Sequence, residues 1–389
     1  MLLCVLGSMP RLSLAELEAV VGHDLVKPVG QYYALVNDKN GFLHERIGGT
    51  IKAATLLSTL PSSRWNKVSA ATFDVIVSQL EEKAKNSNHK LTLGISAYGF
   101  RISPKQLWLL AFAINKNLKK KGYSVRIVMG KEFTLNSAQV IHNKLTGEFG
   151  SEFLLVANGA KTYIAKTVSV QNIDSYSKRD YGKPNRDMNV GMLPPKLAQI
   201  MINLAKLDKN RTLLDPFCGT GSILMEAALL GSKLEGGDIK KRMVDYTKAN
   251  LDWLAKEYNI KIDYNLICAD ATTHKWSNKF DCVATETYLG PSIRYVQDYE
   301  SIKKASDYCN KLVEDFLTNL RPQLTNNAQC CIAVPMWHFK DIFIHLPIVK
   351  EIENLGYCRV NFTHVNNSEL VYYREGQVVG RELLVLQKI

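Results

Sequence analysis

Apolar and polar positions along the chain alternate in blocks whose character changes near residue 170. The apolar run at residues 2–6 predicts a strand, and Ser13 followed by Glu16 has the spacing of a capping box at a helix start. From about residue 90, strand-like and amphipathic helical runs follow one another, and Asn158-Gly159 marks the turn of a strand pair. These patterns predict compact α/β modules.

The last two hundred residues alternate short apolar strands with helical segments. Strands are expected at 212–215, 233–239, 266–270, 280–285 and 328–335. Parallel strands that are separated by helices need right-handed crossovers, so this pattern predicts a doubly wound parallel sheet. The β-rich runs around Glu375-Gly376 predict an antiparallel hairpin that finishes the sheet, and the polar stretch 171–195 predicts a linker or an ordered crossing loop.

The overall composition says little about function, but the distribution of charged residues along the chain is informative. The chain has 389 residues, of which 46% are hydrophobic and 22% charged, as in ordinary globular proteins of two or three domains. The net charge is +12, and the segment from Lys83 to Arg186 holds 18 Lys and Arg against 5 Asp and Glu. Such a concentration indicates a polyanionic partner, usually nucleic acid and less commonly an anionic membrane surface.

Other classes of protein are disfavoured by the apolar runs and the cysteines. No run approaches the 18 or so residues that span a bilayer, and the N-terminus does not resemble a secretory signal, so we expect a cytoplasmic protein with no membrane partner. The eight cysteines form no C-x-x-C pair and mostly lie in apolar runs. Buried reduced thiols are therefore expected, with no metal site.

The strongest chemical signal is LLDPFCGTGSILMEAAL at residues 213–229. An apolar strand ends at Asp215, and a turn with Gly219 and Gly221 leads into a helix. Glycines at such a turn let a ligand approach the backbone closely, while the aspartate can take a cationic or hydroxyl group. A nicotinamide fingerprint would need its third glycine at Leu224, and a P-loop would need Gly-Lys-Ser/Thr, so neither fits.

Two further acidic residues end the next strands. Asp238 follows Asp215 by 23 residues, which is close to the spacing at which a carboxylate meets a ribose diol. Asp270 closes the following strand, where it can contact an adenine edge. Because ligands bind outside the carboxyl ends of parallel strands, we expect the three aspartates to converge on one crevice.

These motifs resemble those of S-adenosylmethionine-dependent methyltransferases with a Rossmann-like fold, in particular the tRNA guanine-N2-methyltransferases that carry an N-terminal THUMP domain. Residues 189–205 are similar to the segment that precedes the first strand in this family, and DPFCGTG, EGGDI and CADAT to its three cofactor motifs. Upstream, LNSAQVIHNKL with EFLLV resembles a THUMP helix and strand, and LLCVLG with LSLAELEAV resembles the ferredoxin-like start of these enzymes.

The resemblance implies an α/β fold with a Rossmann-like seven-stranded methyltransferase domain at residues 196–389. A ferredoxin-like region at 1–80, a THUMP-like RNA-binding domain at 81–170 and a linker at 171–195 would precede it. The implied cofactor is S-adenosyl-L-methionine. By the same resemblance, the residues that bind it are Pro194, Asp215, Phe217, Gly219, Gly221, Asp238 and Asp270.

The resemblance breaks at the catalytic motif. Family members place Asp or Asn, two prolines and an aromatic residue after the fourth strand, whereas this chain has Glu286, Thr287, Tyr288 and Leu289. In the family, the first side chain accepts hydrogens from the exocyclic amine of the substrate base, and the aromatic ring stacks on that flipped base. Glu286 retains an acceptor that is one methylene longer, and Tyr288 offers a ring one position early, so these two are the candidate catalytic residues.

The basic segment and the linker supply candidate RNA contacts. Folded RNA is bound largely through its shape and backbone, which requires a basic surface more than base-reading side chains. A lysine cluster that ends a helix can also simply complement the helix dipole. The candidate RNA-binding residues are Arg101, Lys105, Lys119, Lys120, Lys121, Arg126, Lys131, Arg179, Lys183 and Arg186.

Together these features predict an S-adenosylmethionine-dependent RNA methyltransferase that acts on the exocyclic N2 of a guanosine in tRNA. One alternative is a catalytically impaired homologue that acts as an RNA-binding or partner-activating protein. A second is a methyltransferase for DNA adenine or a small molecule, against which the separate basic module argues. The expected partner is tRNA or another structured RNA, and the protein is expected to be a monomer unless a small activating subunit joins it.

Overall fold

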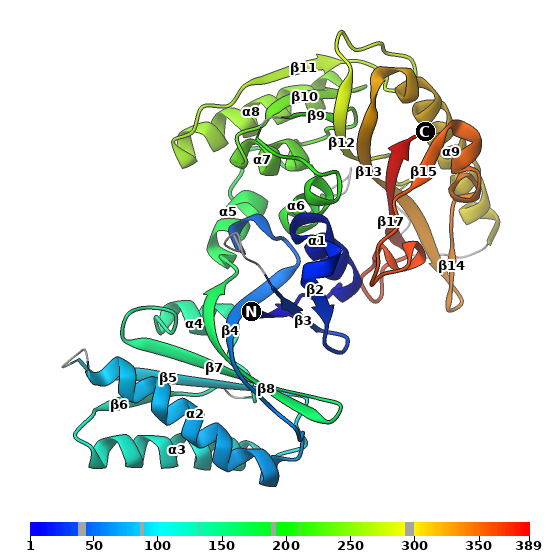
Figure 1. Cartoon of the computed structure of the whole chain (residues 1–389). Helices are drawn as coiled ribbons and strands as arrows, with labels where there is room; N and C mark the ends of the chain where they lie inside the picture. The colour runs from blue at the N-terminus through cyan, green and yellow to red at the C-terminus, as the bar shows by residue number, and fades with distance from the viewer. Residues whose placement is uncertain (38–43, 86–88, 131, 188–191, 210, 292–298) are drawn as a thin grey trace. The chain divides into compact units, whose positions relative to one another are not determined.

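The computed structural model consists of two compact units, each of which is described by itself (Figure 1). The first unit comprises Met1–Pro10, Asp24–Glu45 and Thr50–Ile173, and the second comprises Arg11–His23, Arg46–Gly49 and Asp174–Ile389. The structure describes residues 1–37, 44–85, 89–130, 132–187, 192–209, 211–291 and 299–389. None of the described helices is long and apolar enough to cross a membrane.

One eight-stranded sheet forms the centre of the first unit. Its strands lie in the order β2-β3-β1-β4-β8-β7-β5-β6, and β4 pairs antiparallel with β8. Segments that the sequence assigns to a ferredoxin-like region and to a THUMP-like domain therefore share one sheet, and the predicted boundary between them remains a prediction. The strands are β1 (Leu2–Leu6), β2 (Val26–Pro28), β3 (Tyr33–Val36), β4 (Thr50–Leu60), β5 (Leu91–Tyr98), β6 (Val125–Val128), β7 (Gly150–Asn158) and β8 (Lys161–Val170).

Helices α2 (Trp65–Lys85) and α3 (Pro104–Lys120) pack on this sheet, as Figure 1 shows. Helix α3 buries Leu107, Leu110, Ala111, Ile114 and Leu118. This helical spacing places an apolar stripe against β5, as the sequence predicts. The predicted strand pair β7–β8 is also confirmed, with Gly159 at the turn in a left-handed conformation.

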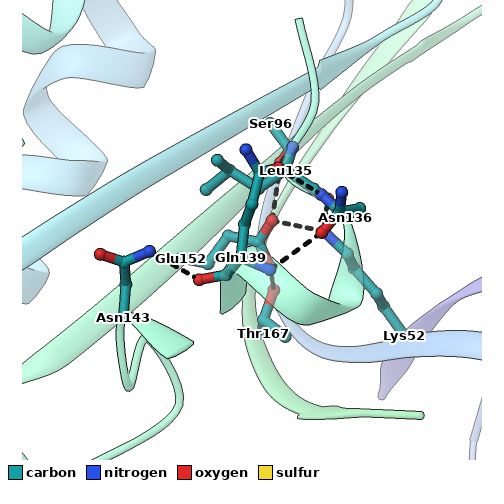
Figure 2. A network of polar contacts seen from close by, with 8 residues as sticks. All are labelled: Lys52, Ser96, Leu135, Asn136, Gln139, Asn143, Glu152 and Thr167. Carbon is teal, nitrogen blue, oxygen red and sulfur yellow. Dashed lines mark hydrogen bonds and ion pairs between the residues drawn. The ribbon is translucent and has the colours of Figure 1, made fainter. Parts of the chain in front are cut away.

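A buried polar network joins five segments of the first unit (Figure 2). The Glu152 carboxylate accepts hydrogen bonds from Lys52 Nζ at 2.5 Å, Ser96 Oγ at 2.6 Å and Thr167 Oγ1 at 2.7 Å. Lys52 Nζ also donates to the Leu135 carbonyl, while the Leu135 amide donates to Ser96 Oγ. The network thus fixes the chain immediately before helix α4 (Ser137–His142), which lies in the segment LNSAQVIHNKL where the sequence predicts a helix.

The second unit is built on a nine-stranded sheet. Seven strands follow the order β11-β10-β9-β12-β13-β17-β15. In addition, β14 pairs with β13, and β16 pairs with β17. Strands β9 to β13 are mutually parallel, which confirms the predicted doubly wound sheet. The bounds are β9 (Thr212–Asp215), β10 (Lys233–Asp238), β11 (Tyr264–Cys268), β12 (Phe280–Glu286), β13 (Leu324–Phe339), β14 (Ile342–Ile344), β15 (Tyr357–Arg359), β16 (Val371–Tyr372) and β17 (Val379–Lys388).

The second unit contains the first helix of the chain together with the later helices. Helix α1 (Pro10–Val21) joins α5 (Ile173–Tyr181), α6 (Pro195–Leu204), α7 (Ser222–Leu229), α8 (Lys241–Tyr258) and α9 (Tyr299–Leu320). Helix α9 buries Ile302, Val313 and Phe316 in a core that also contains Val283 of β12 and Leu384 of β17. The polar stretch 171–195 contains α5, so part of the expected linker is an ordered helix.

The C-terminal hairpin is present, but its position differs from the simplest expectation. Strands β16 and β17 pair antiparallel, with Tyr372 opposite Arg381. However, β17 inserts between β13 and β15 and does not lie at the edge of the sheet. Strand β17 is an almost continuous buried run, which indicates that both of its faces are covered in addition to its two paired edges.

The predicted capping box at Ser13 is wrong. Helix α1 begins at Pro10, whose fixed φ suits the first helical position, so Ser13 lies inside the helix. The Glu16 carboxylate instead accepts hydrogen bonds from the Gly48 and Gly49 amides, at 2.8 and 2.7 Å, and from Asn203 Nδ2 at 2.7 Å. An acidic side chain of the N-terminal helix therefore caps two backbone amides within the second unit.

Replacing Glu16 by alanine is expected to destabilise the second unit by about 2–4 kcal/mol, because three buried donors lose their acceptor. Urea unfolding, followed by tryptophan fluorescence, measures this change. Arg11→Ala on the same helix is the control, since its ion pair with Glu369 is exposed and should contribute below about 1 kcal/mol. Equal effects of the two substitutions would contradict the assignment.

Candidate active site

The glycine-rich turn after β9 is held open by its backbone conformation. Gly219 and Gly221 have φ of +51° and +82°, which is the left-handed region that side chains disfavour. A Cβ on Gly221 would also lie 2.9 Å from the Thr247 side chain, so residue 221 must be glycine. Thr247 Oγ1 donates to the Gly219 carbonyl at 2.8 Å, and the Cys218 amide donates to the Gly237 carbonyl. Helix α8 and strand β10 thus fix the turn.

Asp215 is the most buried carboxylate of the site, with 1% of its surface exposed. Its Oδ1 accepts a hydrogen bond from Thr285 Oγ1 at 2.7 Å, and the Phe217 amide lies 3.4 Å away. Burial raises the pKa of Asp215 to about 7, and the nearby carboxylates of Asp238 and Glu286 add to the increase. The structure therefore brings together three acidic side chains from the ends of β9, β10 and β12.

Asp238, at the end of β10, is the second carboxylate of the site. Its Oδ2 accepts from the Gly219 amide at 3.1 Å, and its Oδ1 accepts from the Lys240 amide at 2.8 Å. Partial burial raises the pKa of Asp238, while these backbone donors oppose the increase. Each oxygen keeps a further lone pair, so the carboxylate can still accept hydrogens from a ligand diol.

The other predicted cofactor residues lie at three different places. Asp270 is exposed and accepts hydrogen bonds from the amide and hydroxyl of Thr272, which makes it part of a local turn. The Phe217 ring packs edge-on against Phe316, and Pro194 precedes helix α6 as its N-cap. Among the described residues, no hydrogen bond joins Asp270 to Asp215, so the role of Asp270 at an adenine ring remains a prediction.

Glu286 pairs with Arg381, a residue that the sequence analysis did not single out. Arg381 Nε donates to Glu286 Oε1 at 2.5 Å, and the two side chains are 10% and 15% exposed. Glu286 ends β12 opposite Ala333, and Arg381 lies near the start of β17 opposite Pro335. The only signal in the sequence was a single arginine within the apolar run VVGRELLVLQ.

Tyr288, the other candidate catalytic residue, is 44% exposed. Its ring meets Tyr308 of α9 edge-on, with 6.0 Å between the ring centroids. A second aromatic group in the same unit consists of His338, Phe343 and Tyr373, whose centroids are 5.1 to 5.2 Å apart. Of these rings, those of Tyr288, Tyr308 and Phe343 are exposed, and an exposed ring is suited to stacking on a base.

Most candidate RNA-binding residues of the first unit are exposed. Arg101, Lys105, Lys119, Lys120, Lys121 and Arg126 all reach the surface. Lys121 pairs with Glu81, and Arg126 donates to Asn143 Oδ1 at 3.0 Å. Helix α3 also exposes Trp108, Leu109 and Phe112, which the sequence analysis missed because it assigned this helix only a buried stripe and a basic end. Lys131 lies outside the described residues.

Two residues of the α5 region are buried and cannot meet an RNA backbone, which corrects the prediction made for them. Arg179 is 5% exposed, and its Nε donates to Glu226 Oε1 at 2.6 Å. Lys183 is 3% exposed and donates to Ser222 Oγ at 2.9 Å, and burial lowers the pKa of Lys183 to about 8. Both cations are used to hold helix α7 in place, whereas Arg186 is exposed and lies over the Tyr181 ring.

Two family profiles match parts of the chain. Residues 184–335 match the family described as RMKL-like, methyltransferase domain, and residues 71–249 match one described as DNA methylase. The second unit has a methyltransferase fold. The solved structure of TrmN from Thermus thermophilus is similar over 100% of this chain and 99% of its own, with a TM-score of 0.53 and 14% identity, which extends the shared fold to both units.

Curated relatives are similar in sequence over part of their length. A tRNA (guanine(10)-N2)-dimethyltransferase from Methanothermobacter thermautotrophicus is 35% identical over 152 residues, which are 39% of this chain and 40% of that protein. The tRNA (guanine(10)-N(2))-methyltransferase TRMT11 from Bos taurus is 26% identical over 222 residues, 52% and 44% of the two chains. The matches span about two-fifths of these relatives. They confirm the predicted resemblance, while a THUMP domain remains a prediction.

Proposed function

We propose that this protein is an S-adenosyl-L-methionine-dependent methyltransferase that acts on the exocyclic N2 of a guanosine in tRNA. The observation that carries the proposal is the convergence of Asp215, Asp238 and Glu286 beside a glycine turn at the carboxyl ends of β9, β10 and β12. The names of the curated relatives support the choice of tRNA and guanine.

The donor groups present fit this cofactor. Asp238 offers carboxylate oxygens to ribose hydroxyl groups, and the open turn at Gly219 leaves room because a Cβ there would meet nothing closer than 4.0 Å. Asp215 offers a buried carboxylate to a cationic amino group. When bound, S-adenosylmethionine supplies a methyl group on a sulfonium, which is already activated for transfer.

The chain's own contribution to transfer is alignment and a hydrogen-bond acceptor. The Glu286 carboxylate accepts a hydrogen from the exocyclic amine and thereby orients its nitrogen, and Tyr288 offers an exposed ring for stacking on the base. The exposed cations Arg101, Lys105, Lys119 and Lys120 would neutralise backbone phosphates. A small activating subunit and a cytoplasmic location belong to the same proposal as expectations.

The test is to incubate the protein with methyl-labelled S-adenosylmethionine and bulk tRNA, and to digest the RNA to nucleosides. Label in N2-methylated guanosine is expected. Cofactor binding without labelled RNA would instead favour an impaired homologue that binds RNA or activates a partner. Preferential labelling of adenine in duplex DNA would favour the DNA methyltransferase alternative, to which the match at residues 71–249 gives some support.

A double substitution, Lys119→Glu with Lys120→Glu, tests the contribution of the basic surface. We expect the KM for tRNA to rise about tenfold or more while kcat changes little, because phosphate contacts contribute to binding rather than to chemistry. Lys248→Glu with Lys256→Glu is the matched control, since these lysines are also exposed but lie on α8 outside the basic segment. An equal rise in KM for both pairs would remove α3 from the proposed surface.

The raised pKa of Asp215 predicts a pH dependence of cofactor binding. Below pH 7 this carboxyl holds a proton in the free protein, so binding a cationic amino group requires its release. The Kd for S-adenosylmethionine should therefore rise as the pH falls through about 7, by at most about tenfold per pH unit. Calorimetric titrations between pH 5.5 and 8.5 measure it, and Asp215→Asn should flatten the profile. A profile unchanged by that substitution would assign the dependence to another group.

A further inference from the structure

The ion pair between Glu286 and Arg381 differs from a more extensively bonded buried ion pair of the second unit, that of Arg179 with Glu226. Arg179 and Glu226 share two hydrogen bonds, from Nε at 2.6 Å and Nη2 at 3.2 Å, and Arg179 also donates to Ser175 and Tyr258. By contrast, Glu286 and Arg381 share one bond, from Nε to Oε1. Within the described residues, Glu286 Oε2 and the terminal nitrogens of Arg381 have no hydrogen-bond partner.

Glu286 Oε2 and the terminal nitrogens of Arg381 are neither fully buried nor fully solvated. Both side chains are largely withdrawn from water, yet none of their polar atoms is among the completely buried atoms that lack a partner. Stability alone does not explain such a pair, because two charges lose hydration and regain only one mutual hydrogen bond. An arginine and a glutamate with unused donors and an unused acceptor, side by side, have the chemistry of a binding surface for a planar polar ligand.

The position of the pair also points to the reacting base. Glu286 is close enough to Asp215 to raise the pKa of that carboxyl, and both lie at the carboxyl ends of their strands. Arg381 flanks the same end of β13, and its guanidinium lies 5.8 Å from the centroid of the Tyr372 ring. The pair therefore borders the place where the proposed substrate must present its amine.

We propose that Glu286 and Arg381 together recognise the Watson–Crick edge of guanine. On that edge N1 and N2 carry hydrogens and O6 is an acceptor, so a carboxylate can accept from N1 and N2 while a neighbouring guanidinium donates to O6. Adenine turns an unprotonated N1 toward the same carboxylate and has an amine where guanine has O6. Arg381 is thus a specificity-determining residue. This inference rests on the proposed function only for the identity of the base.

Binding of nucleotides tests the pair without any methyl transfer. Guanosine 5′-monophosphate and the 2-aminopurine ribonucleotide both carry the N2 amine, but the analogue lacks O6 and the N1 hydrogen. In calorimetric titrations with S-adenosylhomocysteine present, the unmodified protein should bind the guanine nucleotide at least about tenfold more tightly. Arg381→Met should remove the part of that preference that depends on O6, whereas Glu286 still distinguishes the N1 hydrogen, and Arg381→Lys should restore part of the loss.

A structural role for Arg381 would give a different pattern. Arg359→Met is the matched control, because Arg359 pairs with the buried Glu382 on the same strand β17. It should weaken both nucleotides equally, if at all. Equal binding of the two nucleotides by the unmodified protein, or equal weakening of both by Arg381→Met, would overturn the inference. Preference for guanine without methyl transfer to tRNA would support the inference while the proposed function fails.

Discussion

Replacing Asp215 by alanine is expected to abolish detectable methyl transfer and to weaken S-adenosylmethionine binding by about 100-fold. The substitution removes a carboxylate that is 1% exposed and leaves the Thr285 hydroxyl and the Phe217 amide without their acceptor. It also removes the negative charge that would meet the cofactor's cationic amino group. Both effects act on the same glycine turn, so binding and catalysis should fall together.

Calorimetric titration measures the loss of binding, and labelling of tRNA measures the loss of transfer. Asp252→Ala is the control, because this exposed carboxylate accepts one bond from Tyr264 and lies outside the site. It should leave both quantities unchanged. Circular dichroism and the unfolding midpoint establish that the Asp215 variant is folded. A folded Asp215→Ala protein that binds the cofactor as tightly as the unmodified chain would refute the proposed cofactor site.

Replacing Lys52 by methionine is expected to destabilise the first unit by about 3–5 kcal/mol, because it leaves the Glu152 carboxylate buried without its counter-charge. The two side chains are 2% and 0% exposed, so water cannot take the place of the ammonium group. Ser96 and Thr167 would still donate to the carboxylate, but the Leu135 carbonyl would lose its partner (Figure 2). The chain before α4 should then loosen first.

Urea unfolding of the unmodified and variant proteins measures this change in the free energy of unfolding. Adding Glu152→Gln to Lys52→Met should recover part of the loss, because the unpaired charge is then absent. Lys121→Met is the surface control: its pair with Glu81 is partly exposed and should contribute below about 1 kcal/mol. A loss for Lys52→Met no larger than that of the control would show that the network contributes little to stability.

The residues of the candidate site could be predicted from the sequence where they belong to a local sequence pattern. Asp215 and Asp238 were found because each ends an apolar strand, and the parallel sheet brings strand ends to one edge. Glu286 was found through the resemblance to the catalytic motif of the methyltransferase family. Gly219 and Gly221 were found because they form a glycine-rich turn between a strand and a helix, and their left-handed backbone angles agree with that assignment. Arg381 was missed because it is 95 residues from Glu286 along the chain and no periodicity relates the two.

Local sequence patterns are therefore sufficient to predict the strands, the amphipathic helices, the glycine turn and the concentration of positive charge between Lys83 and Arg186. Each of these depends on neighbours within a few residues. Which charges are buried, and what each of them contacts, can be seen only in the folded protein. Glu16 caps the amides of Gly48 and Gly49, and Arg179 is withdrawn from the surface by Glu226. The partner of a buried charge is set by distant segments that folding brings together, because the desolvated charge must be satisfied wherever the chain places it.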